Sequence, residues 1–519
     1  MRALDALTSG ELDVLVIGGG ITGAGAALDA ATRGLTVGLV EARDLASGTS
    51  STSSKVIHGG LRYLEMGDFG LVREALRERE LLLTRLAPHL VRPVPFLWPL
   101  RRRAVERAYL GAGLLLYDSI GGARSVPRHR HLSKRRALQV APALRSEALV
   151  GAMQFHDAQE DDAKMVVAVA RTAAAHGAHV ATRVRVEGFR APGVLNAVDE
   201  ETGAELVVRA RHVAAAAGAW TDGLRDLAGG VSSRRIAPSK GVHIFVPGDR
   251  IEMETGVLAR TEKSVLFVVP WKGGWLIGDT DTPWRFGPDR VVATGADVEY
   301  LLAKANALLA APLRREDVCG VTAGLRPLVA SAQSSDTTRI SRKHVVETPS
   351  PALTTIAGGK YTTYRVMAAD LIDVVARDLG VIAPSATRDV PLVGAEHDGE
   401  LAALIDARPD LADPLDPRGS GPVRAEVVHA CTHDGALHLE DVLARRTRLA
   451  LTAPDRGLAA AAPAAALMAD VLGWDAERTR REVDGWHAKV AAQHAAEAEH
   501  DDELALSAYR AALAEPVRQ

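Results

Sequence analysis

The sequence is poor in cysteine and contains no long apolar run. Cys319 and Cys431 are the only cysteines among the 519 residues, so no CxxC pair, zinc-type spacing or disulfide framework can form. We therefore expect a reducing, cytoplasmic setting and no metal site. No apolar stretch approaches the roughly 20 residues that a membrane-spanning helix needs, and the N-terminus lacks the apolar segment of a signal peptide. The chain is expected not to cross a membrane, although it can lie on one.

Neither sign of charge dominates the sequence. The 62 basic and 65 acidic residues leave a formal net charge of -3. Nucleic-acid binding usually demands a basic surplus, so we expect no nucleic-acid partner. A hydrophobic content of 47% and a charged content of 24% are typical of a folded globular protein. The length exceeds what one ordinary hydrophobic core supports, which predicts two or three domains.

The N-terminal segment has the pattern of a dinucleotide-binding unit. We expect a buried strand, a helix and a second strand, at residues 13–17, 21–33 and 35–40. Between the first two, Gly18, Gly20 and Gly23 fit G-x-G-x-x-G, which provides a tight turn, close approach of a pyrophosphate and close helix packing. Glu41 follows the second strand, where it can accept hydrogen bonds from ribose hydroxyls. The order predicts dinucleotide binding, but the motif does not distinguish FAD from NAD.

Two later glycine turns favour FAD. An apolar strand ends at Gly218, close to Trp220, and another ends at Gly358 and Gly359, where a helix begins. A helix N-terminus suits the negative charge that a reduced flavin ring develops. Three such turns in one chain indicate a cofactor contacted by distant segments.

Several segments resemble the FAD-dependent glycerol-3-phosphate dehydrogenase family. The most specific is TSSTSSKVIHGGLRYLE at residues 49–65, and supporting motifs are KGVH at 240–243, FVVPW at 267–271, AGLRPL at 323–328 and GGKYTTYR at 358–365. Two departures from the family pattern are Asp279, where threonine is more frequent, and Val242, where serine is common.

The resemblance implies an α/β fold, α+β overall. A Rossmann-like, discontinuous FAD-binding domain of the D-amino-acid-oxidase type would comprise residues 11–90, 150–235 and 318–385. A substrate cap built on a β-sheet would comprise residues 91–149 and 236–317. A C-terminal α-helical domain would cover residues 390–519, with amphipathic helices at 439–451 and 476–491. These tail helices would pack on the FAD domain or on a second subunit of a homo-oligomer.

The resemblance also implies site residues. The expected FAD contacts are Gly18, Gly20, Gly23, Glu41, Thr49, Ser50, Ser54, Lys55, His58, Gly60, Gly218, Trp220, Gly358, Gly359, Lys360 and Thr362. The expected substrate contacts are Arg62, Tyr63, Arg326, Arg342 and Lys360, because a phosphate dianion calls for fixed cations. The expected catalytic residues are Arg326, Lys360 and His58. The residue that accepts the substrate proton stays open between His58, His243 and Lys360.

The activity implied by the resemblance is oxidation of sn-glycerol 3-phosphate to dihydroxyacetone phosphate. A hydride would pass from C2 to flavin N5, and the electrons to a membrane quinone. The basic and apolar segment 101–117 has two interpretations: an interfacial helix, which would attach the protein to the inner face of the cell membrane, and an amphipathic helix packed on the cap. The membrane quinone implied by the resemblance favours the first. The alternatives are an oxidase that uses O2 and produces H2O2, a related FAD-dependent amino-acid oxidase, and a flavin-binding protein without turnover.

Overall fold

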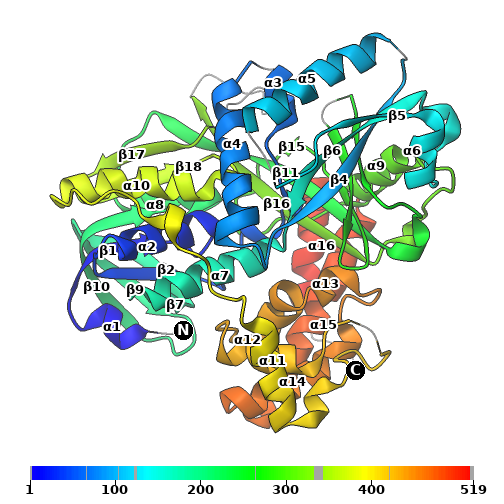
Figure 1. Ribbon diagram of the computed structural model, residues 1–519. Coiled ribbons are helices and arrows are strands. Elements are labelled where there is room, and N and C mark those ends of the chain that lie inside the picture. Colours follow the sequence, from blue (N-terminus) through cyan, green and yellow to red (C-terminus); the bar gives the residue numbers. More distant parts are fainter. Residues whose placement is uncertain are drawn as a thin grey trace.

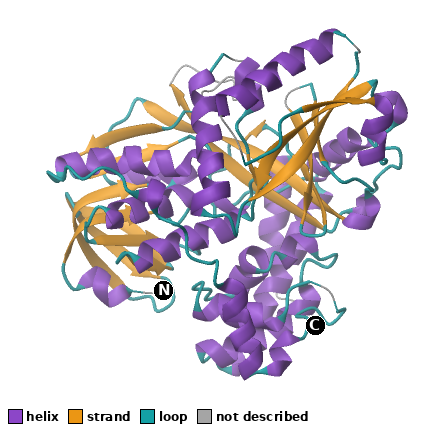
Figure 2. Ribbon diagram, viewed as in Figure 1, coloured by secondary structure: helices purple, strands orange, loops and turns teal. Residues whose placement is uncertain are grey.

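The computed structural model describes residues 3–65, 67–102, 104–121, 125–262, 265–331, 343–419 and 421–514. Two β-sheets lie beside each other, and a helical C-terminal domain lies below them in the view of Figures 1 and 2. This arrangement brings segments from three parts of the chain to one edge of the first sheet.

The first sheet is mainly parallel. Its strand order is β17-β18-β10-β1-β2-β7, with β9 paired to β10 and β8 to β9. The pairs β18·β10, β10·β1, β1·β2 and β2·β7 are all parallel. The strands are β1 (Glu11–Ile17), β2 (Val37–Glu41), β7 (His179–Thr182), β8 (Val184–Ala191), β9 (Val194–Asp199), β10 (Glu205–Ala215), β17 (Val345–Ser350) and β18 (Leu353–Ala357).

Alternating residues of β1 bury both faces of this sheet. Val14 and Val16 pack in the core formed with helices α2 (Ile21–Thr32), α7 (Asp162–Ala175) and α10 (Tyr364–Asp378). Leu15 and Ile17 pack in a second core on the opposite face. A parallel strand buried on both faces reads as a continuous apolar run, which is the pattern seen at residues 13–17. The sheet is therefore the middle of three layers.

The second sheet is mixed. Its order is β15-β11-β14-β13-β12-β4-β6-β3, with β16 paired to β11 and β5 to β6. Its strands are β3 (Val56–Ile57), β4 (Arg92–Leu100), β5 (Arg130–Ser133), β6 (Gly151–Gln159), β11 (Arg234–Pro247), β12 (Gly256–Arg260), β13 (Val265–Trp271), β14 (Gly274–Gly278), β15 (Thr282–Pro283) and β16 (Gly320–Ser331). Because β3, β6 and β16 belong to it, this sheet extends beyond the ranges 91–149 and 236–317 expected for the cap.

Strand β4 contains three prolines, a residue that cannot donate to the hydrogen-bond ladder of a sheet. Pro93, Pro95 and Pro99 are all at odd positions, and every residue of β4 is nevertheless in register with β6. Since backbone polar groups alternate between the two edges of a strand, the missing N–H groups all fall on the edge away from β6. That edge is paired with β12 at Phe96 and Leu97. The carbonyl of Pro95 faces it and accepts a hydrogen bond from Thr255.

The remaining helices outside the C-terminal domain lie around the sheets. They are α1 (Leu4–Thr8), α3 (Leu61–Glu65), α4 (Phe69–Leu81), α5 (Val105–Gly121), α6 (Lys134–Val140), α8 (Thr221–Leu227) and α9 (Gly295–Asn306). Helix α5 begins four residues later than the expected start at 101. The carboxylate of Glu106 accepts hydrogen bonds from the N–H groups of Arg101 and Arg102, at 2.7 and 2.9 Å, which holds these residues outside the helix.

The C-terminal domain is helical. Its elements are α11 (His397–Ala407), α12 (Arg424–Thr432), the π-helical segment η11 (Asp441–Arg446), α13 (Leu449–Thr452), α14 (Leu458–Leu472), α15 (Ala476–Ala498) and α16 (Asp502–Ala514). The segment 439–451, expected as one helix, is two pieces that join at Arg448, whose φ is 69°. The helix expected at 476–491 continues to Ala498.

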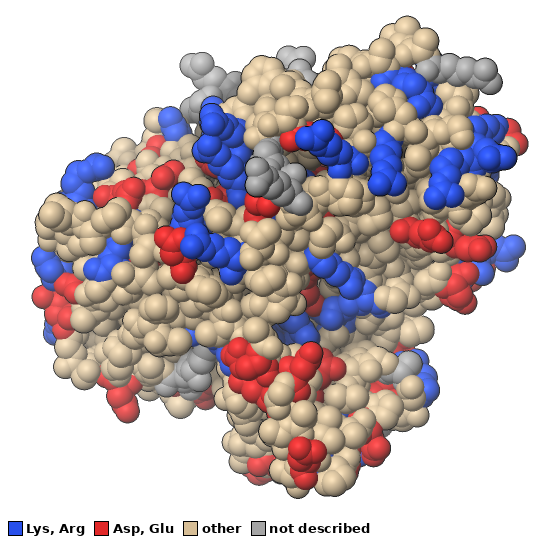
Figure 3. Space-filling model, viewed as in Figure 1, with Lys and Arg blue, Asp and Glu red and all other residues tan. Residues whose placement is uncertain are grey.

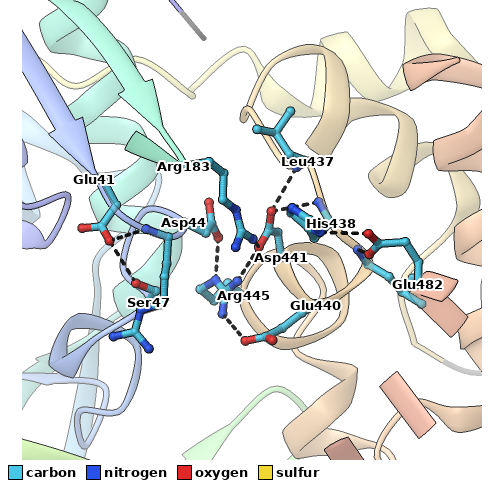
Figure 4. Close-up of polar contacts among 12 residues, drawn as sticks. Glu41, Asp44, Ser47, Arg183, Leu437, His438, Glu440, Asp441, Arg445 and Glu482 are labelled. Atoms are coloured by element: carbon cyan, nitrogen blue, oxygen red, sulfur yellow. Dashed lines mark hydrogen bonds and ion pairs between the residues drawn. The ribbon is translucent and has the colours of Figure 1, made fainter. Parts of the chain in front are cut away.

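Buried ion pairs join this domain to the first sheet. Asp44, in the loop that follows β2, binds Arg445 and Arg446 of η11 at 2.5 and 2.8 Å. Arg183 binds Asp441 at 2.8 Å. Figure 4 shows how Asp44, Arg183, Asp441 and Arg445 meet between the two parts of the molecule. The loop after β2 is therefore held by the C-terminal domain.

Candidate cofactor and substrate site

Three glycine turns lie at one edge of the first sheet. Strands β18, β10 and β1 are neighbours and run parallel. Their carboxyl ends lead into Gly358 and Gly359, Gly218, and Gly18, each with a positive φ. Ligands of open parallel sheets bind at the carboxyl ends of the strands. The geometry thus brings together the three turns that the sequence analysis identified separately.

The turn after β1 leaves room for a pyrophosphate. A Cβ at Gly23 would lie 1.8 Å from the carbonyl oxygen of Gly18, and one at Gly18 would lie 2.6 Å from that of Ala216. At Gly20 the nearest atom to an added Cβ is the Ser50 hydroxyl oxygen, at 3.1 Å. That hydroxyl also accepts a hydrogen bond from the N–H of Ile21, the first residue of α2. The missing side chains and the helix N-terminus fit a dinucleotide phosphate.

Glu41 and Trp220 lie beside this turn. The carboxylate of Glu41 accepts hydrogen bonds from the N–H groups of Gly19 and Arg43, at 2.7 and 2.8 Å. The Arg43 guanidinium lies 4.8 Å from the centre of the Trp220 ring. The Trp220 indole N–H donates to Asp289 at 2.7 Å. The acid at the end of β2 is placed where a ribose would lie in a dinucleotide fold.

The Ser/Thr-rich segment is anchored to distant elements. The Thr49 hydroxyl donates to the carbonyl of Leu325 at 2.5 Å, and the Ser54 hydroxyl lies 2.9 Å from Nε2 of His243. Lys55 is fully buried and binds Asp162 at 2.7 Å. Burial lowers the pKa of Lys55, although Asp162 acts in the opposite direction. Lys55 therefore forms a buried ion pair with an acid 107 residues away, which sequence spacing does not indicate.

A group of charged and polar side chains lies around the turns at Gly60 and Lys360. Tyr63 is on α3, and Lys360 precedes the 3-10 turn η8 (Tyr361–Thr363) that opens α10. The Lys360 ammonium lies 3.4 Å from the centre of the Tyr63 ring, a cation–π contact. The Thr362 hydroxyl donates to the carbonyl of His58 at 3.3 Å. Gly60, with φ 78°, allows the Lys360 ammonium to lie close to the backbone of this turn, because a Cβ at Gly60 would lie 3.2 Å from the Lys360 nitrogen.

His58 and His243 are neutral imidazoles at neutral pH. Burial, and then the charge of Lys360, lower the pKa of His58 to about 4. Burial also lowers the pKa of His243 to about 4, despite the opposing charge of Asp279. Both rings can therefore accept a proton, although the low pKa values make each a weak base until a ligand changes its surroundings.

Arg326 lies on β16 between two carboxylates. Its guanidinium forms an ion pair with Asp279 and lies 3.9 Å from Asp281. It also donates to the carbonyl of Thr280 at 3.0 Å. Burial alone would lower the pKa of Arg326, but Asp279 and Asp281 outweigh it and raise the pKa. Asp279 is one of the two departures from the family pattern, and its pairing with Arg326 was not predictable from that departure.

Two expected substrate contacts cannot be located. Arg342 lies outside the described residues, and for Arg62 the structure describes the helical backbone but not the side chain. The described site is therefore formed by Tyr63, Arg326, Lys360 and the two histidines.

This fold and this site define a dinucleotide-dependent oxidoreductase. Comparison with known families identifies the cofactor, since the family described as FAD dependent oxidoreductase matches residues 13–365. A second family, described as the C-terminal domain of alpha-glycerophosphate oxidase, matches residues 397–479. The cofactor is FAD.

Individual relatives show which group of FAD-dependent oxidoreductases the chain resembles. Glycerol-3-phosphate dehydrogenase 2 of Mycobacterium tuberculosis (strain ATCC 25618 / H37Rv) is 47% identical, over 95% of this chain and 90% of that protein. The crystal structure of glycerol-3-phosphate dehydrogenase from Bacillus halodurans complexed with FAD superposes with a TM-score of 0.75 at 27% identity, covering 94% of this chain and 96% of that one. The chain belongs to the FAD-dependent glycerol-3-phosphate dehydrogenase family. L-alpha-glycerophosphate oxidase from Mycoplasma pneumoniae shares the fold, with a TM-score of 0.56 at 18% identity over 70% of this chain and 95% of that one.

Proposed function

We propose that the protein oxidises sn-glycerol 3-phosphate to dihydroxyacetone phosphate with FAD as the oxidant. The observation that carries the proposal is the group formed by Arg326, Lys360 and Tyr63, next to the edge of the first sheet where the three glycine turns lie. When bound, FAD supplies the acceptor for the hydride from C2. The protein must bind the phosphate, orient C2 and take up the hydroxyl proton.

The distribution of charge suggests how the substrate lies. Arg326 faces two carboxylates, so a phosphate dianion at that position would be repelled. Lys360 and Tyr63 provide a cation and a hydroxyl group, and the Lys360 ammonium lies over the Tyr63 ring. We therefore assign the phosphate to Lys360, Tyr63, Arg62 and Arg342, and the C2 hydroxyl to the side of Arg326. His58 and His243 are the neutral bases available for the proton.

We assign the FAD contacts to the residues at the carboxyl ends of β1, β10 and β18, where the three glycine turns lie. We assign the pyrophosphate to Gly18, Gly20, Gly23 and Ser50, and the ribose to Glu41. The segments at Gly218 and Trp220, and at Gly358, Gly359 and Thr362, would contact the rest of the cofactor. Thr49, Ser54 and Lys55 would support the flavin side through their anchoring contacts.

Anaerobic titration of the purified yellow protein with glycerol 3-phosphate tests the activity. We expect the flavin absorbance to bleach with glycerol 3-phosphate and not with amino acids. The Arg326→Ala variant should keep its FAD and lose most of this reduction. Arg408→Ala is the matched control, since Arg408 lies on the surface of the C-terminal domain and pairs with Asp410. Normal reduction of Arg326→Ala would show that the substrate lies elsewhere.

The electron acceptor is proposed to be a membrane quinone reached from helix α5. In the part of the chain that the structure describes, no helix combines the length and hydropathy needed to cross a bilayer. Helix α5 instead exposes apolar side chains along its outer face: Val105, Tyr109, Leu115 and Leu116 are 75%, 57%, 61% and 39% exposed. Basic side chains gather where α5, β5 and α6 lie in Figure 3. Apolar and basic side chains together favour an anionic lipid surface such as the inner face of the cell membrane.

Vesicle binding and product analysis test this second part. The protein should sediment with vesicles that contain anionic lipid, and Leu115→Glu should abolish this without changing flavin reduction in solution. Leu504→Glu is the control, because Leu504 is also exposed, at 58%, but lies on α16. Reduction of a soluble quinone analogue is expected to exceed peroxide formation. Stoichiometric peroxide would instead identify an oxidase.

A further inference from the structure

Four metal-ligating side chains face one another between helices α11 and α12. His397 and Glu400 are three residues apart on α11, while His429 is on α12 and His433, four residues later, is the C-cap residue of that helix. Both spacings bring side chains to the same face of a helix. Nε2 of His429 lies 2.6 Å from a carboxylate oxygen of Glu400. The ligand atoms of His397, Glu400 and His429 all lie within 4.8 Å of one another.

We propose that His397, Glu400 and His429 bind a divalent transition metal ion, with Zn²⁺ as the best match. Imidazole nitrogen and carboxylate oxygen are ordinary zinc ligands at about 2.0–2.2 Å, which puts two ligand atoms of a tetrahedral site about 3.3 Å apart. The atoms are already close to this spacing, so small side-chain rotations suffice to admit the ion. The ring of His433 stacks on His429 at 4.6 Å, and its Nε2 is 3.9 Å from Glu400. His433 or a water molecule would complete the tetrahedron.

A second carboxylate orients the buried ligand. Oδ2 of Asp434 lies 3.5 Å from Nδ1 of His429, while Nε2 of the same ring faces Glu400. Metal-bound histidines commonly direct their other ring nitrogen to a carboxylate, which fixes the ring and raises its basicity. His429 is 1% exposed, so its ring is held in this orientation. His429 would thus be the metal ligand, and Asp434 the carboxylate that orients its ring.

The charge of the cluster suits a divalent cation. Arg171 of α7 lies 3.3 Å from Glu400, 3.3 Å from Asp434 and 3.8 Å from Glu396. Metal binding requires neutral imidazoles, and the carboxylates of Glu396, Glu400 and Asp434 then outnumber the contacting guanidinium of Arg171, with Arg446 also acting on Asp434. Figure 3 shows acidic side chains gathered over α11 and α12. Arg171 can keep its contact with Oε1 of Glu400, while Oε2 of the same carboxylate, which faces His429, turns to the ion.

The ion would act on structure and not on the redox reaction. It would join α11, which follows the linker from the first sheet, to α12 in the core of the C-terminal domain. Through Arg171 it would also be coupled to α7, which packs on the first sheet. Cysteine spacing led to the expectation of no metal site, whereas these ligands are histidine and glutamate side chains of two helices, with His397 and His429 32 residues apart.

Zinc binding to the untagged holoprotein tests the proposal. After dialysis against a chelator, the protein should take up one Zn²⁺ per chain in isothermal titration calorimetry and in elemental analysis. His397→Ala, Glu400→Gln and His429→Ala should each lose this uptake. Asp434→Asn should weaken it by about 10–100-fold, the usual effect of removing a supporting partner. His176→Ala is the matched control, an exposed histidine at the end of α7, and should bind as the unaltered protein does.

Cobalt gives a readout that does not depend on the variants folding. Co²⁺ bound to the unaltered protein should show the intense visible bands of a tetrahedral site, at wavelengths longer than the flavin absorption, and Zn²⁺ should displace them. Absence of uptake by the unaltered protein, octahedral-type weak bands, or equal uptake by Glu400→Gln and His176→Ala would each overturn the proposal. Flavin reduction by glycerol 3-phosphate is expected to be the same with and without the ion.

Discussion

Replacing Asp44 with asparagine should loosen the C-terminal domain and weaken FAD binding. Asp44 is 1% exposed and accepts hydrogen bonds from Arg445 and Arg446. Asparagine has the same shape but no charge, so two buried guanidinium groups would lose their shared carboxylate. The loop that carries Asp44 also follows Glu41, and the N–H of Ala46 in it donates to the carbonyl of Gly19 in the first glycine turn. Loosening this loop should therefore also displace the first glycine turn, where we expect FAD to bind.

The magnitude follows from two arguments. Removing one partner of a buried ion pair costs about 3–5 kcal/mol. Burial would raise the pKa of Asp44, but Arg446 and Arg445 outweigh it and lower the pKa to about 2 from the ordinary 3.8. That difference corresponds to about 2 kcal/mol of stabilisation. Because the folded pKa is depressed, this contribution is complete above pH 3.8 and is lost as the pH falls through about 2.

Urea unfolding followed by circular dichroism, with FAD release followed by flavin fluorescence, measures both effects. We expect Asp44→Asn to lose about 2–5 kcal/mol of unfolding free energy near neutral pH and to release FAD at lower urea. Asp410→Asn is the control, because Asp410 pairs with Arg408 at the surface and its loss should not be measurable. If Asp44→Asn unfolds at the same urea concentration as this control, the buried pairs do not hold the domain in the way described.

Three further predictions concern other parts of the molecule. Gly23→Ala should yield colourless protein, since its Cβ would lie 1.8 Å from the Gly18 carbonyl, whereas Gly113→Ala on α5, with open space, should keep its flavin absorbance. Tyr117→Phe should cost about 1–3 kcal/mol in urea unfolding, because the buried hydroxyl links the Gly59 N–H to Asp157 at 2.8 and 2.7 Å; a cost no larger than that of an exposed substitution would refute this. Burial would lower the pKa of His438, but Glu201 and Glu482 raise it to about 9. Its stabilising contribution is therefore complete below pH 6.5 and lost as the pH rises through about 9, and His438→Gln should remove this dependence from thermal unfolding curves.

The parts of the fold that depend on neighbouring residues were predictable from the sequence. The unit expected at 13–17, 21–33 and 35–40 is observed as β1, α2 and β2, because the apolar run, the glycine motif and the helix-ending Gly34 all act over short distances. The three glycine turns could be recognised for the same reason. That they share one sheet edge depends on the strand order β18-β10-β1, which no single segment specifies.

Long-range pairings could not be predicted in this way. Lys55 meets Asp162, and Arg448 meets Asp161 at 2.6 Å, across hundreds of residues in the second case. The break in the segment 439–451 falls at this same residue, since Arg448 adopts φ 69° and pairs with Asp161. The prolines of β4 depend on distant segments in the same way, because their effect is set by which strand lies on each edge of β4.

Helix α5 connects the outside of the protein to the turn at Gly59 and Gly60 in the candidate site. Its outer face is apolar and exposed, while Tyr117 on its inner face holds the peptide N–H of Gly59, between His58 and Gly60. One helix diameter, about 10 Å, therefore separates the surface that would touch lipid from the backbone that positions a candidate base. A tilt of α5 on contact with a bilayer would move the Tyr117 hydroxyl and, with it, one of the two acceptors that hold the Gly59 N–H, the other being Asp157.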